Sequence, residues 1–336
     1  MTTLQQFLNQ ETVVSLNTNS FPDLEHSFLS VLSHLSLTRV TGADAANFLH
    51  NQLTNDVEHL GTQEAKLAAY CSSKGRMLAS VFFWKIEDDI FLQMSSTIQT
   101  SIQKRLQMFV LRAKVNIASA SEEYISLGLG GKTIGKVLQH WFPHIPSDVH
   151  AKFDNEYGSV IRVADAFGYA RYQWILKRSV LESVWPTLKD SLVIADANVW
   201  RRAEILAGIP HIVDKTQEQF VPQMVNFELI GGINFKKGCY PGQEIVARSQ
   251  YLGKLKRRMS IAEIDSTEVQ AGMEVFSDTD SSQPCGMIVN AELQSNQTSI
   301  CLVELKVSDL DAGNVCFGSA KLKFLPLPYP ILDVTQ

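Results

Sequence analysis

The pattern of apolar residues changes near Met259, and this change restricts the possible folds more than any other feature of the chain. Upstream of Met259, segments with a strand-like period alternate with segments that have a helix-like period. Downstream, short strands alternate with turns, and the helical period disappears. The sequence therefore predicts a mixed α+β part that is followed by a small all-β unit.

The α+β part shows a similar order of elements twice: a strand, a helix, two or three strands and a second helix. The first round is predicted over 33–40 (strand), 45–53 (helix), 66–71, 77–85 and 90–94 (strands) and 97–111 (helix). The second is predicted over 124–129 (strand), 133–142 (helix), 160–163 and 169–176 (strands) and 180–188 (helix). A further helix over 198–207 should end at Gly208, with Pro210 just beyond it.

Length and charge limit the class of protein. At roughly 100–200 residues per domain, 336 residues predict two or three domains. Thirty Lys and Arg residues against 35 Asp and Glu residues give a net charge of −5, which excludes a globally basic nucleic-acid binder. We therefore expect no stable direct binding to nucleic acid.

The first residues of the sequence and the spacing of its cysteines indicate the cellular compartment of the protein. Residues 1–27 are polar and predict an irregular lead-in without a targeting segment, and no apolar run approaches the roughly 18 residues of a membrane span. The five cysteines are widely spaced and form no C-x-x-C pair, which argues against a disulfide framework or a zinc site. We expect a cytoplasmic protein without a bound metal.

Two weaker motifs carry little functional information. Residues 130–136 nearly match a phosphate-binding loop, but Val137 stands where the loop needs a serine or threonine for magnesium. His140 and His144 have the spacing of two metal ligands on a helix, but Pro143 interrupts that helix. We therefore expect neither P-loop activity nor a metal site at these positions.

The segment 235–248 is more informative because it surrounds a cysteine with cations and glycines. Cys239 lies between Gly238 and Gly242 and follows Lys236 and Lys237, and such cations favour the thiolate form. From residue 236 to residue 258 there are seven basic residues and one acidic residue, so this stretch carries +6 and the rest of the chain −11. The stretch is interpreted as an anion site, and a solvated basic loop remains the alternative.

This segment also resembles a known signature. Lys237-Gly-Cys-Tyr-x-Gly-Gln-Glu244, with Arg248 four residues on, is similar to the signature of the YgfZ family, which is related to the glycine-cleavage aminomethyltransferase. Further blocks along most of the chain resemble the same family: 41–44, 53–57, 71–77, 207–210, 220–224, 231–235 and 325–329.

The resemblance implies a fold and a function. The fold would be α+β, with a ring-like core of ferredoxin-like units over 28–255 (lobes 28–120 and 121–255) and a C-terminal β-barrel over 256–331. The function would be that of a folate-binding accessory protein that supports the assembly or repair of iron–sulfur enzymes. Its partners would include enzymes that modify tRNA, such as the tRNA methylthiotransferases. Its cofactor would be tetrahydrofolate or another folate, held in a central cavity.

The resemblance also implies roles for individual residues. The reactive group would be Cys239, assisted by Lys237 and Arg248, and the cofactor would contact Trp200, Leu35, Tyr240, Gln243 and Glu244. Trp200 matches a tryptophan that marks the folate pocket of the family, whereas Leu35 takes the place of a second aromatic residue. From the chemistry of folate, an aromatic face such as Trp200 suits the flat head, and Arg201 or Arg202 suits the anionic tail. A core aromatic residue on an amphipathic helix is the alternative for Trp200.

Two other functions compete with this one. A one-carbon transferase of the aminomethyl type would carry paired acids just after the glycine hairpin, where this chain has Ala79 and Ser80. A cysteine hydrolase would need a base beside Cys239, and the nearest histidine in sequence is His211. Whether the protein is an enzyme is left open by the sequence.

Overall fold

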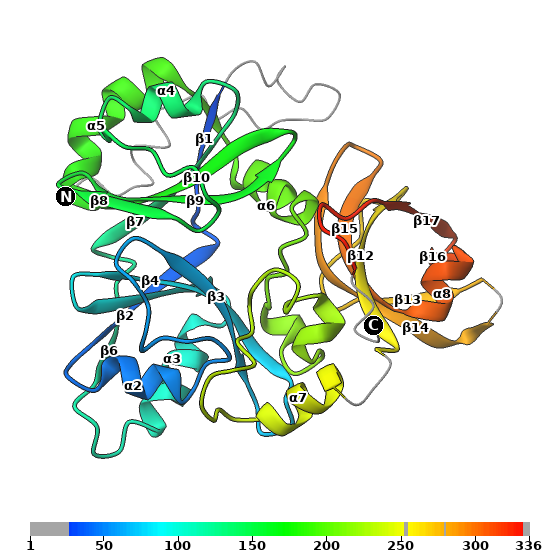
Figure 1. Ribbon diagram of the computed structural model, residues 1–336. Coiled ribbons are helices and arrows are strands. Elements are labelled where there is room, and N and C mark those ends of the chain that lie inside the picture. The colour runs from blue at the N-terminus through cyan, green and yellow to red at the C-terminus, as the bar shows by residue number, and fades with distance from the viewer. Residues whose placement is uncertain (1–26, 252–254, 279, 332–336) are drawn as a thin grey trace.

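The computed structural model describes residues 27–251, 255–278 and 280–331 (Figure 1). It contains two β-sheets and one closed barrel, which are joined by helices and by a long connection over 207–251. Apart from residue 27, the irregular lead-in expected over 1–27 lies outside the described residues. No helix in the described part of the chain is long and apolar enough to cross a membrane.

The first sheet has the order β3-β4-β5-β2-β6, and its neighbouring strands run antiparallel. Most side chains of β4 are buried, because helices and the connection over 207–251 leave little of this sheet open to water. The elements are β2 (Leu35–Thr41), α2 (Ala45–His50), β3 (Ala65–Cys71), β4 (Met77–Ile86), β5 (Asp89–Ser95), α3 (Gln99–Met108) and β6 (Asn116–Ser119).

The second sheet has the order β11-β1-β7-β10-β9-β8. Its elements are β1 (Phe28–Val31), β7 (Tyr124–Gly130), α4 (Ile134–Leu138), β8 (Lys152–Asn155), β9 (Gly158–Ala166), β10 (Tyr169–Lys177), α5 (Arg178–Ser191), β11 (Val193–Ala195) and α6 (Ala197–Leu206). β1 pairs antiparallel with β7 and parallel with β11. Residues 28–31, which the expected division places in the first lobe, therefore pair in the sheet of the second. All four are buried, as suits an interior strand.

The barrel closes in the order β12-β15-β14-β13-β16-β17, with β17 pairing back onto β12. Its strands are β12 (Arg257–Ile264), β13 (Glu274–Ser277), β14 (Asp280–Leu293), β15 (Ser299–Lys306), β16 (Val315–Phe317) and β17 (Ala320–Leu325). The short helix α8 (Val307–Ala312) was not expected in this all-β unit. The α+β core and the C-terminal barrel confirm the predicted fold class.

The connection between α6 and the barrel lies against the first sheet (Figure 1). It contains two 3₁₀ turns, η1 (Asp214–Thr216) and η2 (Pro222–Val225), and the helix α7 (Gln243–Tyr251). One apolar cluster joins residues of the first sheet, the second sheet, the connection and the barrel, including Phe83, Ile175, Phe227 and Ile261. The three β-units therefore share a core, which holds the space between them in a fixed shape.

Candidate functional site: a central cavity and a cysteine loop

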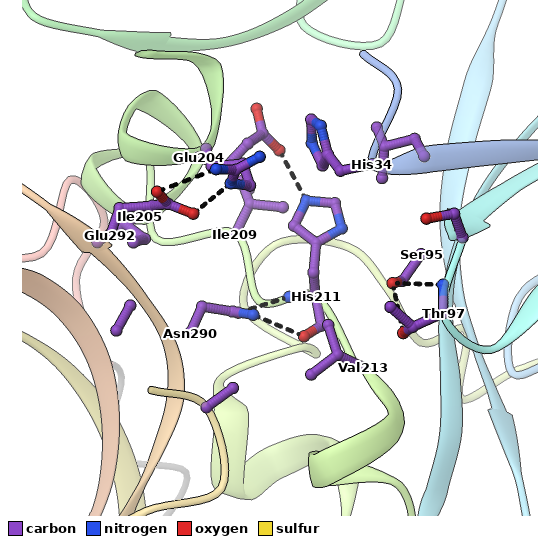
Figure 2. Close-up of a pocket in the computed structure, with 15 residues that line it drawn as sticks. His34, Ser95, Thr97, Glu204, Ile205, Ile209, His211, Val213, Asn290 and Glu292 are labelled. Carbon is purple, nitrogen blue, oxygen red and sulfur yellow. Dashed lines mark hydrogen bonds and ion pairs between the residues drawn. The ribbon is translucent and has the colours of Figure 1, made fainter. Parts of the chain in front are cut away.

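A cavity of about 250 Å³ lies where the two sheets, α6 and the barrel meet (Figure 2). Its walls come from the turn before β2, the end of β5, one face of α6, the segment 209–213 and β14. Apolar side chains such as Leu35, Ile205 and Val213 alternate there with a few polar ones. Small-molecule sites typically combine apolar walls with a few fixed polar groups in this way.

A buried carboxylate forms the polar centre of this cavity. Glu204 Oε1 accepts a hydrogen bond from Arg171 Nη1 at 2.6 Å, and its Oε2 lies 3.1 Å from His211 Nε2. Burial alone would raise the pKa of Glu204, but Arg171 and His211 outweigh it and lower that pKa to about 2. The Glu204 side chain is therefore ionised at neutral pH, with the Arg171 cation as its counter-charge.

The backbone of the segment 209–213 is hydrogen-bonded to a side chain of the barrel. The Asn290 side chain accepts from His211 N and donates to His211 O, both at 2.8 Å. Arg201 forms an ion pair with Glu292 of β14, with Nη2 and Oε2 3.2 Å apart. This arginine is thus already paired with a carboxylate of the barrel.

Trp200 lies on α6 but is not among the residues that line the cavity in the described part of the chain. Its ring is fully buried, and the Arg171 guanidinium lies 4.6 Å from its centroid. A Cβ atom on Gly128 of β7 would come within 2.4 Å of the indole, so the tryptophan fills the space that this glycine leaves. The structure places Trp200 as a packing residue behind the cavity, whereas Leu35 lines the cavity itself.

Lys237 fixes the cysteine loop onto the first sheet. Its Nζ donates hydrogen bonds to His50 O at 2.5 Å and Leu53 O at 3.0 Å, where α2 ends. A cation is favourable at the carbonyl end of a helix. Burial lowers the pKa of Lys237 to about 8, although nearby Asp56 and Cys239 oppose this shift.

The rest of the signature docks onto the turn between β3 and β4. Gly242 has a φ of +79°, and a Cβ atom there would lie 2.4 Å from Ser72 O. Only glycine combines this left-handed backbone with so close an approach. Tyr240 is buried beneath the loop, and burial raises the pKa of its phenol. Gln243 is half-buried, while Glu244 and Arg248 are exposed on α7.

Cys239 is the exposed one of the five cysteines, whereas Cys71, Cys285 and Cys301 are buried and Cys316 is half-buried. The structure also brings His50 to this loop: a Cβ atom on Gly238 would lie 3.5 Å from His50 Nε2. His50 Nδ1 faces Asp56 Oδ1 at 3.1 Å. Sequence proximity pointed to His211, which instead lines the cavity.

The predicted residues thus fall into two places. Leu35 lines the cavity, and the six residues of the signature lie together on the loop and α7, against the first sheet: Lys237, Cys239, Tyr240, Gln243, Glu244 and Arg248. Sequence reasoning missed His34, Glu204 and Asn290 in the cavity and His50 at the loop. The only signals were that Glu204 follows Trp200 by one helical turn and that His50 lies between the blocks at 41–44 and 53–57.

Comparisons with known proteins agree on one family. The family profile described as GCVT N-terminal domain matches residues 25–163. The "tRNA-modifying protein YgfZ" of Colwellia psychrerythraea is 33% identical over 242 residues, which are 71% of this chain and 72% of the relative. The protein with the same name from Pectobacterium carotovorum is 28% identical over 336 residues, 97% of this chain and 100% of the relative.

Among solved structures, the glycine cleavage system aminomethyltransferase T of Bartonella henselae aligns with a TM-score of 0.73 at 14% identity. The alignment covers 89% of this chain and 85% of the other. At this identity the likeness concerns the fold. Together with the Colwellia relative, it confirms the predicted assignment: the chain belongs to the YgfZ family and has an aminomethyltransferase-like fold.

Proposed function

We propose that this chain is a folate-binding accessory protein that supports the assembly or repair of iron–sulfur enzymes, including those that modify tRNA. The observation that carries the proposal is the presence of both a small-molecule cavity, open to solvent on one side, and an exposed cysteine on an anchored loop. The relatives are named tRNA-modifying proteins, which supports a role in tRNA modification. Among the enzymes of this process, tRNA methylthiotransferases are the clients that the family resemblance implies. Folate and these client enzymes are the partners, and the cytoplasm is the compartment.

The residues of the cavity fit the head of a reduced folate. That head is an uncharged bicycle with a flat pyrimidinone ring whose edge carries N–H donors, and the carboxylate of Glu204 is an acceptor for such donors. A cavity of about 250 Å³ has room for the head but not for the whole cofactor. The glutamate tail therefore extends towards the solvent. A bound tetrahydrofolate would supply a carrier for one-carbon units.

The cysteine loop suits an encounter with a partner protein. Cys239 is exposed, while Lys237 and Gly242 hold the backbone on either side of it in place. A thiol presented in this way can reach a group on another molecule without a change in the fold. Lys237 also places a partly buried cation next to this thiol. Arg248 and Glu244 lie exposed on α7 and extend the surface that a client would meet.

The structure favours this accessory role over a one-carbon transferase of the aminomethyl type. Ala79 and Ser80 occupy the place of the paired acids, and both are buried. The Ser80 hydroxyl accepts a hydrogen bond from Ile212 N at 2.9 Å, so it has a structural partner. A methyl group and a hydrogen-bonded hydroxyl cannot assist proton transfer as a carboxylate would.

Complementation tests this function. A strain that lacks its own YgfZ protein would receive the parent chain, Cys239→Ser or Cys316→Ser, and the methylthiolation of its tRNA would be measured. We expect the parent and Cys316→Ser to restore methylthiolation and Cys239→Ser to fail, with equal amounts of folded protein in all three. Full rescue by Cys239→Ser would remove the thiol from the mechanism. Failure of the parent would contradict the accessory role as a whole.

A further inference from the structure

His34 is a half-buried polar residue of the cavity wall. It occupies the turn between β1 and β2, where the chain crosses from one sheet to the other, and its carbonyl accepts a hydrogen bond from Ser96 N at 2.9 Å. Its side chain lines the cavity beside the Glu204–His211 pair (Figure 2). Both of its ring nitrogens are buried, and neither has a hydrogen-bond partner among the residues that the structure describes.

The placement of this ring points to a ligand. Natural structures rarely keep a buried donor or acceptor without a partner, so a ring nitrogen that lines a cavity is suited to meet a polar group of the molecule that occupies it. The charged groups facing the ring are Arg201, His211 and Glu204. Burial, Arg201 and His211 together lower the pKa of His34 to about 3, despite the opposing effect of Glu204. At neutral pH the ring is therefore uncharged and offers one N–H donor and one bare acceptor nitrogen.

We propose that His34 is a specificity-determining residue that recognises the uncharged heterocyclic head of the ligand by hydrogen bonding. The inference rests on the proposed function, in which that ligand is a reduced folate. A reduced pterin carries ring N–H donors, ring nitrogens and a carbonyl around its edge, so it can satisfy either nitrogen of a neutral imidazole. His34 thus supplies polar recognition next to Leu35, where the family would place an aromatic ring.

The charges of the cavity favour the head over the anionic tail. Glu204 and Glu292 lie in the lining with Arg201, and Arg201 is already paired with Glu292. A carboxylate that entered the cavity would meet two carboxylates, Glu204 and Glu292, whose arginines Arg171 and Arg201 are already engaged, so its burial would be costly. An uncharged ring meets no such penalty. Sequence reasoning expected Arg201 or Arg202 to hold the tail, but Arg201 serves the contact between α6 and the barrel.

Binding and stability measurements on two variants test this inference. The probes are tetrahydrofolate, 6-methyltetrahydropterin (the head alone) and p-aminobenzoylglutamate (the tail alone), and affinities are measured by calorimetry under anaerobic conditions. His34→Leu removes both nitrogens, whereas His34→Gln keeps one donor and one acceptor. Neither variant meets backbone strain, since His34 is not among the positions with a left-handed backbone.

We expect His34→Leu to bind tetrahydrofolate and the head alone about tenfold more weakly than the parent, the effect of losing one hydrogen bond of about 1.4 kcal/mol. His34→Gln should recover part of that loss. Without ligand, His34→Leu should melt at the same temperature as the parent or higher, because it removes unpaired polar atoms. A residue with a merely structural role would instead lower the melting temperature on substitution.

The outcomes separate the inference from the function on which it rests. If the parent binds tetrahydrofolate and His34→Leu binds it equally well, the role of His34 is wrong and folate binding stands. If the tail alone binds and the head alone does not, the proposed orientation and the role of His34 are both wrong. If the parent binds none of the three probes, the folate-binding function fails together with the inference.

Discussion

Replacing Glu204 by glutamine tests the electrostatics of the cavity. The pKa of Glu204 falls from 4.5 to about 2 on folding, a difference of about 2.5 units. At about 1.36 kcal/mol per unit, the ionised carboxylate contributes about 3 kcal/mol of stability at pH 7. Glu204→Gln also leaves the Arg171 cation, which is 1% exposed, without a counter-charge. We therefore expect the free energy of unfolding of the variant to be about 3–5 kcal/mol lower than that of the parent at pH 7.

The dependence on pH has a definite sign. Because folding lowers the pKa of Glu204, its contribution is complete above pH 4.5 and is lost as the pH falls through about 2. The difference in stability between the parent and Glu204→Gln should therefore narrow between pH 4.5 and pH 2. Urea unfolding followed by tryptophan fluorescence at pH 7 and pH 3 measures it.

A matched control comes from the same cavity. Glu292 also pairs with an arginine, but Arg201 is 37% exposed, and such pairs contribute only about 0–1 kcal/mol. Glu292→Gln should thus change stability far less than Glu204→Gln. Equal losses in the two variants, or a loss for Glu204→Gln that is the same at pH 7 and pH 3, would refute this account of the buried pair.

Three further predictions concern the cysteine loop and its attachment to the barrel. Gly242→Ala should lower the free energy of unfolding in urea by at least about 1 kcal/mol, since a Cβ atom there meets Ser72 O in a left-handed backbone. An unchanged urea midpoint would contradict this. Arg258→Met should lower the free energy of unfolding, measured in urea, by about 3–5 kcal/mol, because it leaves the buried Glu228 carboxylate without its arginine. A variant as stable as the parent would contradict the importance of this pair. Iodoacetamide should modify Cys239 before any other cysteine of the native protein, as mass spectrometry of peptides would reveal; earlier labelling of a buried cysteine would count against the exposed loop.

Local patterns in the sequence were sufficient to predict most elements of this fold. The strand over 77–85 differs from β4 by one residue at its end, and the helix over 198–207 differs from α6 by one residue at each end, because their apolar residues follow a clear period. The all-β character of the C-terminal unit was also predictable, since its short strands and turns lack a helical period, whereas its closure into a barrel was expected only from the family resemblance. The pairing of β1 with the second sheet was not predictable, because a four-residue strand with three apolar residues fits either sheet and only long-range contacts choose between them.

The candidate site was harder to predict, because its groups meet across long distances in the sequence. Lys237 hydrogen-bonds a carbonyl at residue 50, and Glu204 of α6 pairs with Arg171 of β10. In a sequence, a glutamate on an amphipathic helix looks like a solvated charge, and its buried partner is invisible. Trp200 was difficult for another reason, because an aromatic residue on a helix can face a ligand as well as a core. The space that the absent side chain of Gly128 leaves for the indole is visible only in the structure.

We propose above that the cavity between the two sheets and the barrel binds the head of a reduced folate. A crystal structure with tetrahydrofolate would locate that head. The account predicts that the pterin lies in the cavity beside His34, Leu35 and Glu204, with its glutamate tail directed outward. Density for the pterin at the Cys239 loop, or for the tail inside the cavity, would contradict it.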